Sequence, residues 1–496
     1  MNLAQILADS AARSPEQVAV KLDDFALNYG LLEQVAARVH GLLNARGIQP
    51  GDRVAMMVPN VPQFVPIYYG ILRSGAVVVP LNVLNRRREV EFFLRDSGAK
   101  LLFVWEMFEP EAAPAAAAAD CEWIKVDMEQ FTQLLFGTDP AAEMVERSAQ
   151  DTAVMLYTSG TTGTPKGAEL SHDNVLTNCQ ISRGLFDISD GAVILGALPL
   201  FHAFGQTCAM NNSVVAGGLL TLIPRFDGSK ALEIIQRDKV QVFEGVPSMY
   251  GAMLNAPDRD QYDTSTLEVC ASGGAAMPVE LMRGFEQAFG CIVLEGYGLS
   301  ETSPVASFNH PDRERKPGSI GQPINGVEMK IVDEQDQELP VGEVGEIVIR
   351  GNNVMKGYWG RPDATAEAIR DGWFHSGDLG RIDEDGYFFI VDRKKDMIIR
   401  NGFNVYPREI EEVLYAHPAV REAAVVGIPH DEFGEEVGAA ISLKDGQQAT
   451  PEELRDFVKE QVAAYKYPRK VWITDELPKG PTGKILKREI ERPAAD

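Results

Sequence analysis

Apolar positions recur along the first third of the chain with the spacing of helices interleaved with strands. The spacing predicts, in order, a helix at residues 31–43, a strand at 53–58, a helix at about 63–73 and a strand at 76–80. The alternation continues to about residue 303, with a strand at 218–224, a helix at 229–238 and a strand at 240–244. Strands separated by helices usually form a parallel sheet, so the sequence predicts an α/β fold.

Two segments depart from this pattern. The Ala- and Pro-rich segment 109–120 is predicted to be a surface loop or a frayed helix. After Pro317, short strands at 329–333, 345–350 and 386–391 are separated by Gly, Asp and Pro turns, which is typical of an antiparallel β-unit. From Lys395 onward the pattern predicts a helix at 409–416, strands at 423–427 and 437–443, and a helix at 451–465.

These patterns predict two domains. Residues 1–394 form a large N-terminal domain of parallel βα subdomains, in which residues of about 317–392 make a small β-barrel-like unit. Residues 395–496 form a small C-terminal α+β domain.

The charge of the chain limits the partners that it can bind. Lys and Arg number 47 against 72 Asp and Glu, a formal net charge of −25. Such a chain repels polyanions, which argues against a nucleic-acid partner, and any anionic ligand needs a local, organised site. The five cysteines are widely spaced without a CxxC pair, which predicts buried thiols rather than a zinc site. Neither a signal peptide nor a membrane segment is evident, so the sequence predicts a cytoplasmic protein.

Residues 158–167, TSGTTGTPKG, follow an apolar strand at 153–157 and have the composition of a phosphate-binding loop. Its glycines permit tight turns, while its hydroxyls and Lys166 supply donors for a polyphosphate. A Walker A loop would have Gly before the Lys and Ser or Thr after it, but here Pro165 and Gly167 occupy those positions. The sequence therefore predicts a phosphate loop of another kind.

Seven further motifs follow in order: PLFHAFG (199–205), SGGAAMP (272–278), EGYGLSET (295–302), HSGD (375–378), DRKKDMI (392–398), NGFNVYP (401–407) and PTGK (481–484). With these motifs the chain resembles the adenylate-forming superfamily, which contains acyl- and aryl-CoA synthetases, nonribosomal peptide adenylation domains and beetle luciferases. The resemblance implies that a carboxylate attacks the α-phosphate of ATP to give acyl-AMP and pyrophosphate. A thiol, that of CoA in the synthetases, then displaces AMP.

The resemblance also implies roles for individual residues. Lys484 is expected to bridge the carboxylate and the α-phosphate, and Glu301 to bind Mg²⁺. Thr161, Thr162 and Lys166 are expected to hold the β- and γ-phosphates.

The remaining nucleotide contacts are expected around the ribose and the adenine. Asp378 is expected to accept both ribose hydroxyls, with Arg393 on the other side and the Tyr297 ring against the adenine. The implied site further includes Thr158, Ser159, Gly160, Gly163, Gly273, Gly274, Ala275, Glu295, Gly296, Gly298 and Ser300.

The acyl group and CoA are expected to meet at the same centre. The implied tunnel residues are His202, which is also a candidate catalytic residue, Phe204, Val246 and Gly298, joined by Gly402 and Phe403. The last two are expected to arrive only after the C-terminal domain rotates about a hinge at Lys395. Between residues 466 and 492, Lys and Arg outnumber Asp and Glu eight to four, which predicts a local anion site for ATP and CoA.

The substrate is inferred from what these segments lack. No Asp occurs at 199–206 to pair with an amino group, and no Arg occurs at 243–254 to pair with a second carboxylate. Apolar residues around Val246 favour a medium- or long-chain fatty acid. An aryl-CoA ligase, an acyl–carrier-protein ligase and a luciferase-like oxygenase stay open as alternatives. The spacing of Pro478 and Lys484 also resembles a site of regulatory lysine acetylation, and the oligomeric state is open between monomer and homodimer.

Overall fold

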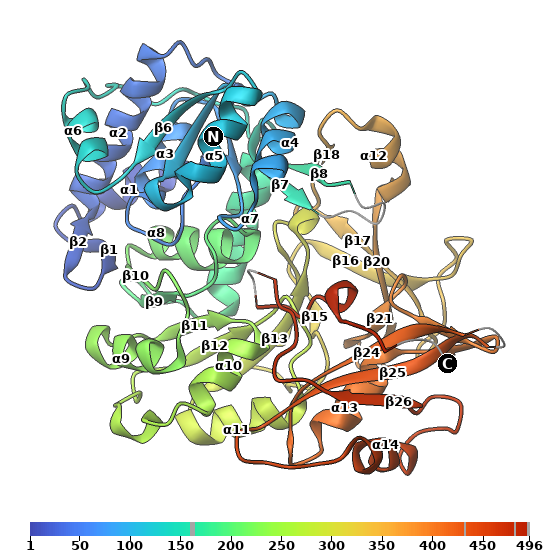
Figure 1. The fold of residues 1–496 in the computed structure, drawn as a ribbon. Helices are drawn as coiled ribbons and strands as arrows, with labels where there is room; N and C mark the ends of the chain where they lie inside the picture. Colours follow the sequence, from blue (N-terminus) through green and yellow to red (C-terminus); the bar gives the residue numbers. More distant parts are fainter. Residues whose placement is uncertain (159–163, 431–432, 481–482, 494–496) are drawn as a thin grey trace.

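The computed structural model describes residues 1–158, 164–430, 433–480 and 483–493, and it contains four sheets (Figure 1). Two large sheets flanked by helices, a half-barrel sheet and a separate C-terminal sheet confirm the predicted α/β class. Among the described residues, no helix combines the length and the apolar character that a membrane span requires.

The first large sheet has seven strands in the order β18-β8-β7-β4-β3-β5-β6. Its strands are β3 (Arg53–Met57), β4 (Val77–Pro80), β5 (Leu101–Trp105), β6 (Glu122–Val126), β7 (Thr152–Thr158), β8 (Lys166–Ser171) and β18 (Gly357–Tyr358). The helices of this region are α2 (Tyr29–Ala45), α3 (Phe64–Arg73), α4 (Arg87–Ser97), α5 (Glu109–Ala118) and α6 (Gln130–Phe136). The predicted phosphate loop joins β7 to β8, which pair as antiparallel neighbours.

The second large sheet has nine strands in the order β15-β14-β13-β12-β11-β9-β10-β1-β2. They are β1 (Val18–Leu22), β2 (Phe25–Asn28), β9 (Val193–Gly196), β10 (Leu219–Leu222), β11 (Val242–Gly245), β12 (Val269–Ser272), β13 (Ile292–Gly298), β14 (Val305–Phe308) and β15 (Gln322–Pro323). The helices are α1 (Gln5–Arg13), α7 (His172–Leu185), the π-helix η2 (Gly205–Asn211), α8 (Asn212–Ala216), α9 (Gly228–Asp238), α10 (Pro247–Leu254) and α11 (Val279–Phe289). Strands β9 to β13 pair in parallel, so their carboxyl ends share one edge, where ligands bind in open α/β sheets.

The predicted β-unit is an antiparallel half-barrel sheet. It contains β16 (Val327–Val332), β17 (Gly345–Gly351), β19 (Ile369–Arg370), β20 (Trp373–Ile382) and β21 (Phe388–Arg393), with α12 (Pro362–Ala368) before β19.

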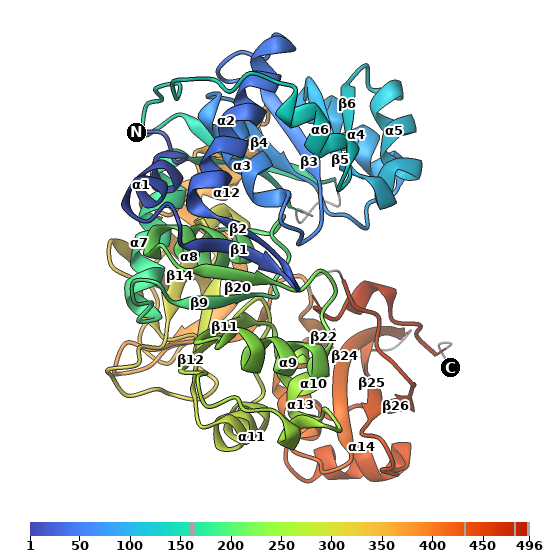
Figure 2. The ribbon, with the colours of Figure 1, turned by 90° about the vertical axis from the view of Figure 1, so that its left-hand side faces the viewer.

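The C-terminal sheet contains β22 (Ile398–Arg400), β23 (Phe403–Val405), β24 (Val420–His430), β25 (Gly434–Leu443) and β26 (Lys470–Ile473). Helices α13 (Pro407–Tyr415) and α14 (Pro451–Lys459) pack on it through a core of their own. In both views this sheet forms a separate lobe, in orange and red, beside the yellow-green part of the chain (Figures 1 and 2).

Two predicted elements differ from the structure. The segment 109–120 is mostly the helix α5, because Ala favours helices strongly and Ala112, Ala115 and Ala116 are buried in the second hydrophobic core. The helix predicted at 451–465 ends at Lys459. Beyond it, the partly buried Val462 and Tyr465 pack against the C-terminal core from turns, which produced apolar spacing without a helix.

Candidate functional site

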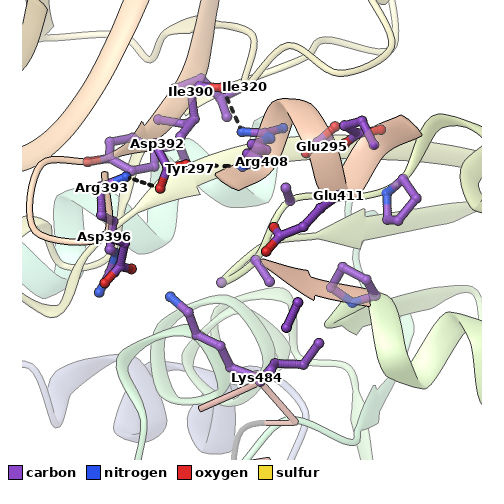
Figure 3. Close-up of a pocket in the computed structure, with 18 of the residues that line it drawn as sticks. Glu295, Tyr297, Ile320, Ile390, Asp392, Arg393, Asp396, Arg408, Glu411 and Lys484 are labelled. Carbon is purple, nitrogen blue, oxygen red and sulfur yellow. Dashed lines mark hydrogen bonds between the residues drawn. The ribbon is translucent and has the colours of Figure 1, made fainter. Parts of the chain in front are cut away.

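The C-terminal lobe meets the N-terminal sheets at a pocket of about 260 Å³ (Figure 3). Five of its lining residues come from five places in the chain: Tyr297 from β13, Asp378 from β20, Arg393 from β21, Arg408 from α13 and Lys484 from the C-terminal loop. The pocket therefore exists only because the two lobes lie together.

Asp378 is held in place from two sides. It lies directly opposite Arg393 in the β20–β21 pair, and the Arg393 Nε lies 3.3 Å from the Asp378 Oδ1. The Tyr297 hydroxyl donates to the Asp378 Oδ2 at 2.5 Å. An organised, buried carboxylate of this kind has the acceptors that a vicinal diol such as a ribose requires.

Glu301 lies next to Thr158, the last residue of β7 and the first of the predicted phosphate loop. Its Oε1 accepts hydrogen bonds from the Thr158 hydroxyl at 2.9 Å and the Tyr358 hydroxyl at 3.0 Å. The Lys166 ammonium lies 5.2 Å from the centre of the Tyr358 ring. The described residues contain no cluster of three or more metal-binding side chains, but one carboxylate beside substrate phosphates is a typical Mg²⁺ site, so Glu301 fits that ion.

Lys484 projects into the pocket toward Arg393 and Asp396 (Figure 3). Burial lowers the pKa of its ammonium group to about 8, and the neighbouring Arg393 adds to this effect. The loop that carries it docks on the start of α10, where the Ser248 hydroxyl donates to the Gly483 carbonyl at 3.3 Å. The ammonium therefore faces the same pocket as Asp378.

Comparison with known protein families identifies the family to which the chain belongs. The sequence profile of AMP-binding enzymes matches residues 7–359, and the profile of the AMP-binding enzyme C-terminal domain matches residues 409–484. The chain belongs to the AMP-binding enzyme family.

Similar proteins narrow the activity of this AMP-binding enzyme. The long-chain-fatty-acid–CoA ligase of Bacillus subtilis (strain 168) is 38% identical, over 98% of this chain and 94% of the relative. The feruloyl-CoA synthase of Amycolatopsis sp is also 38% identical, over 97% of both chains. The crystal structure of ATP bound MatB from Rhodopseudomonas palustris matches with a TM-score of 0.91 at 34% identity, over 98% of both chains. The protein is thus an AMP-forming acyl-CoA ligase that uses ATP and CoA, as the motifs predicted.

The structure brings nine of the predicted site residues together in one pocket. Gly274, Ala275, Glu295, Gly296, Tyr297, Gly298, Asp378, Arg393 and Lys484 line the pocket. Gly298 must be glycine, because a Cβ there would lie 1.9 Å from the Pro304 carbonyl oxygen. Predictions for Ser159, Gly160, Thr161, Thr162 and Gly163 lie outside the described residues.

A second cavity, of about 720 Å³, is lined by Thr158, His202 and Ser300 among others. Burial, together with the nearby Lys484, lowers the pKa of the His202 imidazole to about 4, so the ring is neutral. Its Nδ1 accepts from the Phe204 backbone N–H at 3.3 Å, which leaves the proton on Nε2. Phe204 packs against Gly273, and Val246 lies against Gly274 and Gly483.

The predicted thioester residues lie elsewhere in this orientation. Gly402 forms the turn of the β22–β23 hairpin, and Phe403 is 53% exposed with its ring 4.9 Å from that of Tyr465. Neither lines the pocket. Lys395 is an exposed residue of the turn between β21 and β22, the last strand of the half-barrel and the first of the C-terminal sheet.

Several pocket residues were not predicted from the sequence: Asp392, Arg408, Glu411 and Glu412. Asp392 is part of the motif at 392–398, but no role was assigned to it. The other three lie in α13, and charged residues on a helix are usually exposed to solvent. The basic segment 466–492 also has fewer unpaired positive charges than its excess of Lys and Arg suggested. Lys466, Lys479 and Lys487 pair with Glu409, Glu422 and Glu411 at 2.7–2.8 Å, so much of its charge is neutralised inside the C-terminal domain.

Proposed function

We propose that this ligase activates a medium- or long-chain fatty acid and transfers it to CoA. The observation that carries the proposal is the apolar wall beside Lys484: Phe204 and Val246 are buried against the glycine backbone at 273–274. The segment 243–254 has no Lys or Arg to pair with a second carboxylate. Its acidic residue, Glu244, is fully buried, and neither of its oxygens has a hydrogen-bond partner among the described residues, which further disfavours an anionic tail.

In the first half-reaction, a carboxylate oxygen of the acid forms a bond to the α-phosphorus while the bond to the β-phosphate oxygen breaks and pyrophosphate leaves. Two anions must meet, so a cation between them stabilises the transition state. Lys484, which lines the pocket from the C-terminal loop, would be that cation. Asp378 and Arg393 would fix the ribose, so that the α-phosphate is held within reach of that ammonium.

Glu301 would hold a Mg²⁺ ion, which neutralises phosphate charge when it is bound. Its Oε1 is already engaged by Thr158 and Tyr358, so the orientation of the carboxylate is fixed in advance. We expect Glu301→Gln to abolish adenylate formation at all Mg²⁺ concentrations while the melting temperature stays within a few degrees. Adenylation by this variant at the wild-type rate would contradict the assignment.

In the second half-reaction, the thiol sulfur of CoA bonds to the acyl carbon, the thiol proton is released and AMP leaves. The neutral His202, with its proton on Nε2, would donate to the acyl oxygen as charge develops there. Gly298, Gly402 and Phe403 would surround the pantetheine after the C-terminal domain rotates about Lys395.

An exchange assay with radiolabelled pyrophosphate over a panel of acids, with and without CoA, tests this function. We expect exchange with C8–C18 acids and CoA-dependent release of AMP. Preference for hydroxycinnamates would instead support the aryl-CoA alternative, which the feruloyl-CoA synthase relative favours. Transfer only to a carrier protein, or light emission with oxygen, would replace CoA ligation by one of the other two alternatives.

Lys484 is also the residue at which we propose regulation. Its lowered pKa leaves a larger neutral, nucleophilic fraction at neutral pH than an ordinary lysine has. Acetylation by a lysine acetyltransferase would remove the charge and should stop adenylate formation alone.

A further inference from the structure

Arg408 connects the two domains across the predicted hinge. Its backbone N–H donates to the Asp392 Oδ2 at 3.0 Å, and its Nη1 donates to the Ile390 carbonyl at 3.0 Å (Figure 3). Ile390 and Asp392 belong to β21 of the half-barrel, whereas Arg408 opens α13 of the C-terminal domain. Both contacts therefore join residues on opposite sides of Lys395.

The Arg408 guanidinium also influences two acids, one buried and one half-buried. It acts electrostatically on Glu295, from β13, and on Glu412, one helical turn further along α13. Glu295 is 1% exposed, and its Oε2 has no hydrogen-bond partner among the described residues. Arg408 favours the ionised form of the Glu295 carboxyl group and opposes the rise in its pKa that burial causes, so an ionised Glu295 favours the orientation that keeps Arg408 in place.

These contacts belong to one orientation of the C-terminal domain. Arg408 and Lys484 line the same pocket, and they reach it from α13 and from the C-terminal loop of the same domain. A rotation about Lys395 carries both residues away from β21 and β13 together. The contacts of Arg408 are then lost at the same moment as the ammonium leaves the site.

We propose that Arg408 is a positioning residue for adenylate formation: it latches the C-terminal domain onto β21 and Glu295, and so holds Lys484 in the site. The assignment rests on the role proposed above for Lys484. The proposal also implies that Arg408 is dispensable for the second half-reaction, because the contacts of Arg408 must break before the thiol can enter. Losing the latch therefore affects the two half-reactions unequally.

Arg408→Met tests this, since Met keeps most of the side-chain length and the backbone N–H bond to Asp392 but removes the guanidinium charge and its hydrogen bond to Ile390. Arg421→Met is the matched control: the Arg421 Nη2 also donates to a backbone carbonyl, that of Asp475 at 2.6 Å, but within the C-terminal domain. We expect Arg408→Met to slow pyrophosphate exchange about 10- to 100-fold, the loss expected for one charged hydrogen-bonding group. Acyl-CoA formation from supplied acyl-AMP should stay within twofold of the wild type. The control should change neither rate.

Equal losses in both half-reactions, or unchanged exchange in a folded Arg408→Met, would overturn the proposal. If Arg408→Met does not fold, Arg408→Lys, which keeps the charge and one donor group, should show a smaller loss with the same inequality.

A second measurement needs no acid substrate and separates a failure of the latch from a failure of the proposed function. Spin labels at Asp260→Cys and Asp456→Cys report the distance between the domains, and the five native cysteines are all buried. With ATP present, we expect one main distance in the wild type and in Arg421→Met, and a second population in Arg408→Met. Identical distributions in all three proteins would show that Arg408 does not latch the domain, whatever acid the enzyme uses.

Discussion

At the scale of single residues, Glu295 combines deep burial with an incomplete set of partners. Its Oε1 accepts from the Met277 backbone N–H at 2.9 Å, while its Oε2 is unpaired among the described residues. Burial raises the pKa of the carboxyl group to about 7, although Arg408 and the hydrogen bond from Met277 oppose the rise. The folded protein thus keeps a proton on Glu295 at a pH where the unfolded chain has lost it.

This raised pKa predicts how stability changes with pH. Between about pH 4.5 and 7 the folded state binds the extra proton, so the free energy of unfolding falls as pH rises through that window. Glu295→Gln has no such proton and should be more stable than the wild type at pH 8 by about 1–3 kcal/mol, with little difference at pH 5. Urea unfolding at both pH values measures this. A difference that is the same at both would refute the linkage.

Lys484 predicts a pH effect on the reaction itself. Its pKa is lowered to about 8, so the free enzyme loses the cation as pH rises through that value. We expect kcat/KM for ATP in pyrophosphate exchange to fall about tenfold per pH unit above 8. His202, with a pKa of about 4, stays neutral over the same range and adds no second step. Lys484→Ala should be slower by about 10²–10³-fold and should lack this decline; a decline of the same size would assign it to another group.

The sequence could predict those site residues that belong to a recognisable motif, but not those whose role depends on tertiary contacts. Asp378, Glu301 and Lys484 stand in ordered motifs; Asp378 and Lys484 line one pocket, and Glu301 accepts a hydrogen bond from Thr158 at the start of the phosphate loop. The bond between Tyr297 and Asp378 joins residues 81 positions apart and could not be predicted, because it depends on how β13 and β20 meet. Arg408 left no signal, since a charged residue at a helix start is ordinary on a surface.

At the scale of elements, the β22–β23 hairpin turns at Asn401 and Gly402, with φ values of +50° and +79°. Consecutive left-handed residues are typical of a type I′ turn, which matches the twist of a hairpin. A Cβ on Gly402 would meet nothing within 4 Å in this orientation. A larger residue here therefore costs only backbone strain, until the domain rotates.

Gly402→Asn separates these two effects, because Asn tolerates the left-handed region better than other side chains. We expect adenylate formation within about threefold of the wild type and thioester formation reduced at least tenfold, because the new side chain would enter the predicted thiol tunnel. Gly446→Asn is the matched control: this C-terminal turn glycine has a φ of +74° and equally open surroundings. If Gly402→Asn slows both half-reactions equally, Gly402 is needed only for its left-handed backbone conformation and not for the thiol tunnel.

The predicted boundaries of helices and strands match the structure where the local sequence pattern and the tertiary packing agree. The strand β3 and the helix α9 lie within a residue or so of their predicted ends. In α5 and in the turns after α14, burial against a neighbouring element decides the structure, and periodicity alone does not contain that information.

At the scale of the whole molecule, an AMP-binding enzyme of net charge −25 has its candidate nucleotide site in a pocket lined by both domains. Lys484 and Arg393 approach that site from opposite sides of the hinge, so the cations are complete only while the domains lie together. If the domains separate after adenylate formation, as proposed above, Lys484 would leave the site and the hold on pyrophosphate would weaken. The movement proposed to admit CoA would thus also favour the release of pyrophosphate.

A disulfide between the two domains should therefore allow adenylate formation but block transfer of the acyl group to CoA. A Cβ on Gly483 would lie 2.7 Å from the Ser248 Oγ, close to the place that the sulfur takes in Ser248→Cys. Ser248→Cys and Gly483→Cys can therefore be joined by a disulfide after a small adjustment. The left-handed φ of +76° at Gly483 makes the second substitution cost about 1–2 kcal/mol, which the folded domain interface should tolerate.

The oxidised double variant should form acyl-AMP in a single turnover, because Lys484 stays in the site, but acyl-CoA formation should fall at least 100-fold. Reduction should restore it, whereas Ser248→Cys alone should be indifferent to oxidant, since the five native cysteines are buried. Rapid-quench measurement of both products on one preparation follows the two steps. If the oxidised enzyme makes acyl-CoA as fast as the reduced one, the thiol reaches the adenylate without rotation, and Gly402 and Phe403 then have no place in the tunnel.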